Sequence, residues 1–190
     1  IKEHRFMQDM LSEDSLTAVR SLLSRIVYVT FSVEAIGAVF LYFSSKSISD
    51  EVSFSFIFHC IFHSVSAFCN AGLSSFSSGD YLEYFNVTYF SSVIMLLIVI
   101  GGIGFPFIAN TIDYLEHRLI KRKGRKYGAF SVSSKLVGIT SLVLLLSGTV
   151  IFYFLESHLL FKDLSTAKGL FHSLFASVTS RTAGFSTIDI

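Results

Sequence analysis

Three long apolar runs limit what this chain can fold into. They lie at 26–43, 89–110 and 136–155, and each approaches the roughly 20 residues that a helix needs to cross a ~30 Å hydrocarbon layer. Of the 190 residues, 52% are hydrophobic and only 15% are charged, a balance too apolar for an ordinary soluble domain of this length. We therefore predict an all-α integral protein of the cell (inner or plasma) membrane that crosses the lipid several times.

Composition also argues against several other classes of function. The formal net charge is only +1, so no bulk charge indicates a nucleic-acid partner. The two cysteines, Cys60 and Cys69, share one apolar stretch and lack the spacing of a disulfide framework or a metal site, so we expect free thiols. No nucleophile, base and acid can be assembled from the Ser, Thr and His residues, and we predict neither catalysis nor an organic cofactor.

Two shorter apolar segments, 52–68 and 166–180, contain His, Ser and Thr, and an Ala-Gly pair follows each one closely. Such a segment suits a helix that enters the membrane partway and turns back, because non-helical backbone is tolerated there only where protein or a polar cavity surrounds it. On length and pattern alone, a short amphipathic helix on the membrane surface is an equal alternative.

The distribution of Lys and Arg predicts the topology, since cytoplasmic loops are enriched in them. The segment 111–135 carries seven, so we predict a basic cytoplasmic loop; they are Arg118, Lys121, Arg122, Lys123, Arg125, Lys126 and Lys135. The segment 1–25 lies two crossings earlier and is predicted to be cytoplasmic as well. Both short segments then enter from outside, where Asp80 and Glu83 either enrich cations or belong to a plain solvated loop.

The two short segments form an internal repeat. Phe62-His63-Ser64 leads to Ala71-Gly72, and Phe171-His172-Ser173 leads to Ala183-Gly184, with the glycines 112 residues apart (184 − 72). The pattern predicts membrane–pore–membrane repeats with re-entrant half-helices and extended filter loops. The first repeat covers 26–110, with crossings 26–43 and 89–110, half-helix 52–68 and filter 69–73; the next, truncated, covers 136–190, with crossing 136–155, half-helix 166–180 and filter 181–185.

Glycine at these positions suits a cation filter. A potassium ion gives up its water only where carbonyl oxygens replace it, and an extended, partly left-handed backbone that aims its carbonyls along one axis favours Gly. Half-helices ending at the loops would direct about half a negative charge each toward the ion. We predict that the filter consists mainly of the backbone carbonyls of eight residues: Cys69, Asn70, Ala71, Gly72, Arg181, Thr182, Ala183 and Gly184.

These motifs resemble a known family. The stretch 66–73, Ser-Ala-Phe-Cys-Asn-Ala-Gly-Leu, is similar to the second pore loop of the Trk/Ktr/HKT superfamily of potassium transporters, and 179–187, Thr-Ser-Arg-Thr-Ala-Gly-Phe-Ser-Thr, closely resembles the third. The stretch 101–105, Gly-Gly-Ile-Gly-Phe, resembles the segment that closes the helix after the second pore loop. Family members normally have Asn at the position of Cys69, so the contacts behind the second loop are expected to be rearranged.

The resemblance implies a subunit of four repeats around one pore, of which this sequence holds the second and most of the third. The sequence has no initiator Met or signal peptide and stops at Thr-Ile-Asp-Ile, so we expect a fragment of a longer protein. The resemblance further implies potassium uptake by a homodimer of the complete subunit on a cytosolic ring of nucleotide-binding regulatory subunits, with 118–126 as a contact. Sodium-selective or sodium-coupled transport remains an alternative, because the first loop is missing, and a non-conducting membrane assembly protein is a further one.

Single residues carry further expectations. Arg181 is expected to point away from the ion and to brace its loop against a carboxylate or carbonyls, and Glu34 is expected to brace the structure, with a role in ion passage as the alternative.

His63 and His172 are interpreted as packing residues, since two ligands are too few for a metal site. Gly101, Gly102 and Gly104 are expected to allow close helix packing or a bend before Pro106, in preference to phosphate binding. We expect substitution of Gly184 to be at least as harmful as substitution of Gly72.

The topology can be tested by labelling cysteines with a membrane-impermeant reagent in intact cells. A cysteine introduced by Ser78→Cys should be labelled, and one introduced by Lys123→Cys should not, because the positive charges hold the loop at 111–135 on the cytoplasmic side. Labelling at Lys123 but not at Ser78 would overturn the topology.

Overall fold

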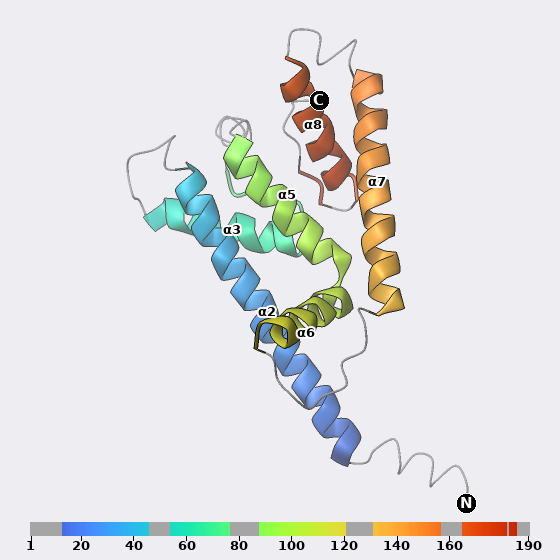
Figure 1. Cartoon of the computed structure of the whole chain (residues 1–190). Coiled ribbons are helices and arrows are strands. Elements are labelled where there is room, and N and C mark those ends of the chain that lie inside the picture. The colour runs from blue at the N-terminus through green and yellow to red at the C-terminus, as the bar shows by residue number, and fades with distance from the viewer. Residues whose placement is uncertain are drawn as a thin grey trace, which may run out of the picture. The chain divides into compact units, whose positions relative to one another are not determined.

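The computed structural model describes residues 13–45, 54–76, 88–120, 131–156, 165–181 and 183–185. This part of the chain is helical apart from its loops and contains no strand, so the predicted all-α fold is confirmed (Figure 1). The helices are α2 (Glu13–Ser45), α3 (Phe54–Phe68), α5 (Thr88–Ile103), α6 (Phe105–Ile120), α7 (Val132–Glu156) and α8 (Thr166–Thr179). The chain forms two compact units, Ile1–Val33 and Glu34–Ile190, and the contacts between elements that are described below lie in the second.

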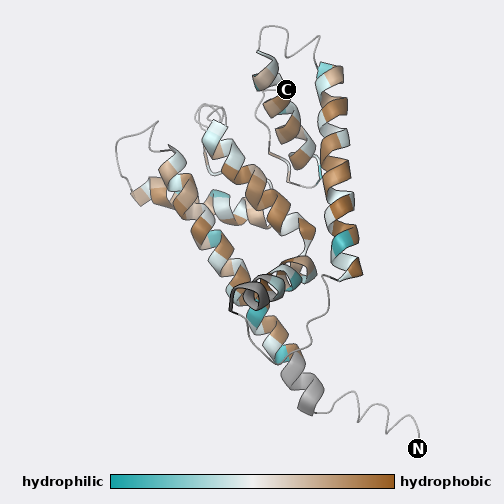
Figure 2. Ribbon diagram, viewed as in Figure 1, coloured by the Kyte–Doolittle hydropathy of each residue, from teal (hydrophilic) through white to brown (hydrophobic). Residues whose placement is uncertain are grey.

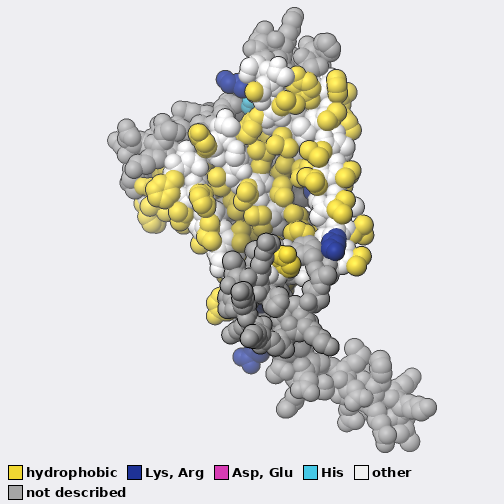
Figure 3. Space-filling view, viewed as in Figure 1, with side chains coloured by type: hydrophobic (Ala, Val, Ile, Leu, Met, Phe, Trp, Pro, Cys, Tyr) yellow, Lys and Arg dark blue, Asp and Glu magenta, His cyan; other side chains and the backbone are white. Residues whose placement is uncertain are grey.

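Two helices are long and apolar enough to cross a membrane alone: α2 over Val19–Ser44 and α7 over Val132–Glu156. Figure 2 shows hydrophobic residues along almost the whole of α7. Large apolar side chains such as Leu136, Leu146 and Phe154 are exposed on it, and hydrophobic side chains also cover much of the face drawn in Figure 3. Apolar side chains on the outside of a long helix suit lipid. The chain is an integral membrane protein.

The range predicted as one crossing, 89–110, is divided between α5 and α6. The two helices meet at Gly104 with a bend of 97°. Gly104 has φ +94°, a conformation that L side chains rarely adopt, and Pro106 just after it has no N–H to continue the hydrogen-bonding of α5. The expected bend before Pro106 is therefore confirmed.

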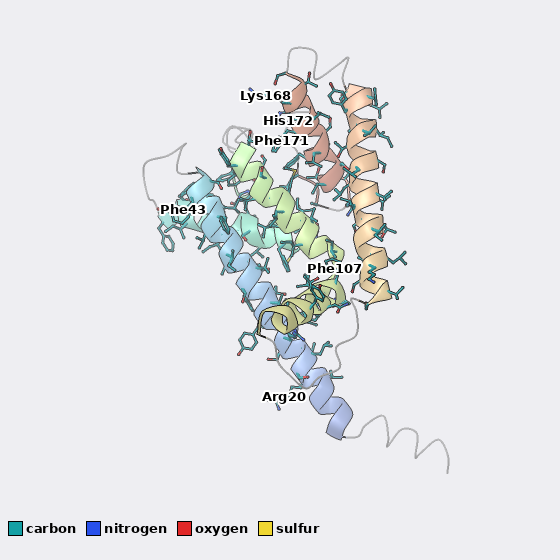
Figure 4. All side chains as sticks on the ribbon, viewed as in Figure 1. Arg20, Phe43, Phe107, Lys168, Phe171 and His172 are labelled. Carbon is teal, nitrogen blue, oxygen red and sulfur yellow. The ribbon has the colours of Figure 1, made fainter. Side chains whose placement is uncertain are left out.

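The bend places α6 against the start of α7. The amide of Asn110 donates a hydrogen bond to the hydroxyl of Ser134 (2.9 Å), and the ring of Phe107, labelled in Figure 4, packs over Gly138. Ser131 caps α7, because its hydroxyl accepts a hydrogen bond from the backbone N–H of Ser134 (3.1 Å). The first turn of α7 is thus held by polar contacts to α6 and to its own cap.

The helices α3 and α8 are too short to cross a membrane and lie against longer helices. Figure 1 shows α8 alongside α7, and contacts also join α3 to α5 and α5 to α8. Their bounds lie close to the predicted half-helices 52–68 and 166–180. Both bury polar side chains near their C-terminal ends: His63, Ser64 and Ser66 in α3, and Ser173, Ser177 and Thr179 in α8. Burial of polar groups inside the protein argues against helices lying on a membrane surface.

Two glycines near the α5–α6 junction, Gly104 with a positive φ and Gly102 without one, offer a test of the bend. Gly104→Ala should destabilise the full-length protein by about 1–2 kcal/mol, because a β-carbon is unfavourable at positive φ. Gly102→Ala is the matched control, since a β-carbon there would meet nothing closer than 3.8 Å. The midpoint of thermal unfolding in detergent should fall for Gly104→Ala only; equal midpoints for both variants would contradict the strained bend.

Candidate ion-filter loops

The first Ala-Gly loop (69–73) and the second Ala-Gly loop (181–185) lie in contact. Gly72 has φ +68° and Gly184 has φ +69°, so both glycines adopt the left-handed conformation. A β-carbon added to Gly72 would overlap the carbonyl oxygen of Ala183 and come within 3.1 Å of the Cα of Gly184. Two glycines that are far apart in the sequence therefore meet, backbone against backbone.

The crowding at this contact is unequal. A β-carbon added to Gly184 would find its nearest neighbour, the Cα of Gly72, at 3.8 Å, which is ordinary van der Waals contact. The overlap with Ala183 falls on Gly72 alone. The first loop is therefore the tighter one, and its contacts argue against the expectation that substitution of Gly184 is at least as harmful as substitution of Gly72.

Each loop begins directly at the C-terminal end of a half-helix. The backbone N–H of Ala71 donates to the carbonyl of Ser66 (2.8 Å), and the N–H of Ala183 donates to the carbonyl of Thr179 (3.0 Å). The first turn spans six residues and the second spans five, and turns of both kinds close a helix, whose partial negative charge then faces the loop that follows. Both loops therefore sit where the half-helices are most favourable for a cation.

The residue three positions before each glycine ties its loop to the preceding long helix. The thiol of Cys69 lies 3.7 Å from Oε1 of the buried Glu34 in α2, and the guanidinium of Arg181 donates to the backbone carbonyl of Ser141 in α7 (2.5 Å). The positive charge of Arg181 is thus directed at α7. Both contacts are of the kind expected of bracing residues. Thr182, the predicted filter residue next to Arg181, lies outside the described residues.

In each repeat, a serine of the half-helix packs against a glycine of the long helix that precedes it and holds the two helices together. The hydroxyl of Ser64 donates to the carbonyl of Glu34 (2.7 Å) and lies over Gly37, so closely that a β-carbon on that glycine would overlap it. In the next repeat the hydroxyl of Ser177 donates to the carbonyl of Leu145 (2.9 Å) and lies over Gly148 in the same way.

These serine–glycine pairs repeat at nearly the same interval as the Ala-Gly loops, and sequence analysis missed them. In both helices the accepting carbonyl lies three residues before the glycine. The available signal was Gly37 in one predicted crossing and Gly148 in the next, 111 residues apart (148 − 37). Hydropathy did not reveal it, because a glycine in an apolar run gives no indication of which side chain it faces.

The two histidines do not occupy matching positions relative to the loop glycines, although their Phe-His-Ser triplets were aligned as parts of one repeat. His63 lies nine residues before Gly72, whereas His172 lies twelve before Gly184, one helical turn farther from the loop. His63 is fully buried, with Nδ1 2.8 Å from the carbonyl of His59 and Nε2 3.0 Å from the hydroxyl of Ser74. His172 is half-buried on the first half of α8, beside Phe171 (Figure 4). The part of the chain that is described holds no cluster of three metal-ligating side chains.

The segment after the first Ala-Gly loop runs back along α3 and is bonded to one face of it. Ser66 Oγ accepts from the N–H of Leu73 (2.9 Å) and donates to its carbonyl (2.8 Å), His63 pairs with Ser74, and His59 Nδ1 lies 2.7 Å from the hydroxyl of Ser75. Residues 59, 63 and 66 share a helix face by their spacing. Sequence analysis missed this ladder, although the two histidines and one serine on one face of α3 were its visible signal.

The glycine patch at the end of α5 supports the first loop from behind. A β-carbon on Gly101 would overlap the carbonyl of Phe68, the last residue of α3, and would come within 3.3 Å of the Asn70 amide nitrogen. Asn70 itself has φ +54°, and its Oδ1 is buried without a hydrogen-bond partner among the described residues. The expected role of this patch in close helix packing is confirmed.

The fold defines an all-α integral membrane protein in which two short helices, α3 and α8, each lead into an Ala-Gly loop. The whole chain, residues 1–190, matches the model of the TrkH family, described as cation transport protein, and the chain belongs to that family. The predicted resemblance to the Trk/Ktr/HKT superfamily is thereby confirmed.

Several curated proteins are similar along the whole chain. Ktr system potassium uptake protein B of Vibrio alginolyticus is 31% identical over 192 residues, which cover 100% of this chain and 40% of that protein. Ktr system potassium uptake protein D of Bacillus subtilis is 30% identical over 193 residues, covering 100% and 40%. Potassium/sodium uptake protein NtpJ of Enterococcus hirae is 30% identical over 188 residues, covering 96% and 38%. The chain thus spans about 40% of the length of these relatives.

The serine–glycine pairs can be tested by removing the crowding atom. Gly148→Ala should destabilise the full-length protein, because its β-carbon would overlap the Ser177 hydroxyl, and Ser177→Ala should restore part of the loss by removing that oxygen. Gly37→Ala should be rescued less by Ser64→Ala, because Leu97 crowds the same position at 2.8 Å. Thermal unfolding midpoints of the four variants and two double variants measure this. Equal rescue in both repeats would contradict the packing described here.

Proposed function

We propose that this chain is part of a potassium-uptake pore, and that the backbone carbonyls of 69–72 and 181–184 belong to its selectivity filter. The observation that carries the proposal is the contact of Gly72 with Ala183 and Gly184. These residues belong to two left-handed loops, and each loop follows a short half-helix that buries polar side chains. Extended backbone inside a membrane protein needs a polar cavity or a polar ligand. A row of carbonyls that a dehydrated cation occupies meets this need.

The chemistry at the loops suits a cation. The C-terminal ends of α3 and α8 bring partial negative charge, and Arg181, the one charged residue that the described parts of the two loops contain, is bonded to α7. In this proposal Arg181 and Glu34 are bracing residues, and neither contacts the ion. Potassium is the transported ion; no organic cofactor and no catalysed reaction is involved, in keeping with a family of cation transporters.

The complete subunit is proposed to contain four such repeats around one pore, to form a homodimer in lipid, and to sit on a cytosolic ring of nucleotide-binding regulatory subunits. Two relatives are named as components of a Ktr system, which supports a membrane subunit working with a further component. Residues 118–126 are the proposed contact, on the cytoplasmic side that their charge favours.

Transport of sodium is the second candidate, supported by one relative whose name includes both potassium and sodium uptake. A non-conducting assembly protein is disfavoured, because such a protein has no need to bring two left-handed glycine loops together at the ends of half-helices.

Replacing the loop glycines tests the filter. In the full-length protein Gly72→Ser should lower the ratio of potassium to sodium permeability by about tenfold, the factor that corresponds to ~1.4 kcal/mol. Gly184→Ser should lower it less, because a β-carbon meets ordinary contacts there. Reversal potentials, or growth of an uptake-deficient strain at limiting potassium, measure the effect. Unchanged selectivity in both variants at normal expression would show that these glycines are packing residues.

A further inference from the structure

Both Ala-Gly loops are tied at equivalent positions, but with different chemistry. Cys69 and Arg181 each lie three residues before a loop glycine, and each contacts the long helix that precedes its half-helix. The serine–glycine pairs show that Glu34 of α2 corresponds to Leu145 of α7, since each supplies the carbonyl for the locking serine. Arg181 reaches one turn beyond Leu145 toward the N-terminal end of α7. Glu34 reaches the first loop with its side chain, which leans toward the N-terminal end of α2.

We propose that Glu34 is a positioning residue for ion selectivity, acting through the thiol of Cys69 to hold the first Ala-Gly loop against α2. The inference rests on the proposed function, because it assigns Glu34 a part in shaping that filter. Glu34 touches no ion in this account; its effect passes through Cys69, three residues before Gly72.

The surroundings of Glu34 favour this role. Its side chain is 8% exposed, and a carboxylate within a membrane helix is costly unless a polar group faces it. No ion pair reaches Glu34 from the described residues, and the thiol at 3.7 Å is the donor that its carboxylate has there. Its backbone carbonyl meanwhile accepts from Ser64, so one residue fixes both the half-helix and the loop after it.

Movement at Cys69 would also reach the second loop. Gly72 presses on the carbonyl of Ala183 with no room for a β-carbon, so a displaced first loop pushes directly on the backbone of its neighbour. Loss of the Cys69–Glu34 contact is therefore expected to alter selectivity, and not only stability.

The test uses the full-length transporter and the permeability ratio of potassium to sodium from reversal potentials. Glu34→Ala and Cys69→Ala should each lower the ratio about threefold or more, since loss of a hydrogen bond to a charged group shifts an equilibrium by at least that factor. The double variant should be no worse than the more affected single variant, because both remove one contact. Cys69→Asn, whose amide donates to the same carboxylate, should restore the ratio when Glu34 is present and fail to restore it beside Glu34→Ala.

Cys60→Ala is the matched control, because it removes the other cysteine thiol, which is buried in α3, and should leave the ratio unchanged. Additive effects of Glu34→Ala and Cys69→Ala would overturn the inference and favour a direct role of Glu34 in ion passage. An unchanged ratio in both, with Gly72→Ser still harmful, would overturn the inference while leaving the filter standing. If Gly72→Ser were harmless too, the proposed filter would fail with it. Should Glu34→Ala not assemble, Glu34→Met, which is of similar length and cannot accept the hydrogen bond of a thiol as a carboxylate does, and Cys69→Ala decide by the same criteria.

Discussion

The contact between the two Ala-Gly loops depends on glycine at two positions, because a side chain would not fit there or would strain the backbone. Gly72 and Gly184 take a left-handed conformation and approach so closely that a methyl group on Gly72 would overlap Ala183. Extended chain of this kind satisfies few of its own hydrogen bonds, and lipid offers none. The surrounding helices therefore have to hold the loops from several directions, and much of the packing in this part of the chain serves that purpose.

Support comes from small residues and short polar side chains. Gly37 and Gly148 admit a serine from each half-helix, Gly101 admits the carbonyl of Phe68, and Ser66 holds the chain after the first loop by two hydrogen bonds. Apolar contact gives little driving force between helices in lipid, so close backbone approach and hydrogen bonds provide specificity instead. This explains why the buried faces of α3 and α8 contain so many Ser, Thr and His residues.

Sequence reasoning predicted the elements better than their contacts. The apolar runs 26–43 and 136–155 predicted helices long enough to cross a membrane, and the Ala-Gly pairs predicted left-handed loops, because both features follow from local geometry. The third run, 89–110, is instead divided into α5 and α6 at Gly104. The pairing of Ser64 with Gly37 and the tie between Cys69 and Glu34 depend on how helices rotate against each other. Hydropathy does not report that rotation, because an apolar side chain is equally suited to lipid and to a packed interface. The two Phe-His-Ser triplets are identical in sequence but do not correspond in structure. Equivalent positions in the two repeats are those at the same distance from the loop glycine, and the two histidines lie at different distances from it.

Counting from the glycines shows what the two repeats preserve. Nine residues before Gly72 stands His63 and nine before Gly184 stands Phe175, both fully buried rings. Three residues before the glycines, a thiol that meets a carboxylate corresponds to a guanidinium that meets a carbonyl. The chemistry of these two ties differs, yet their direction is the same, from the loop to the preceding long helix. A left-handed backbone constrains residue type severely, because it favours glycine and admits few other residues, such as Asn70. A tether can use any donor and acceptor that reach each other, so its residues are free to diverge as long as both change together.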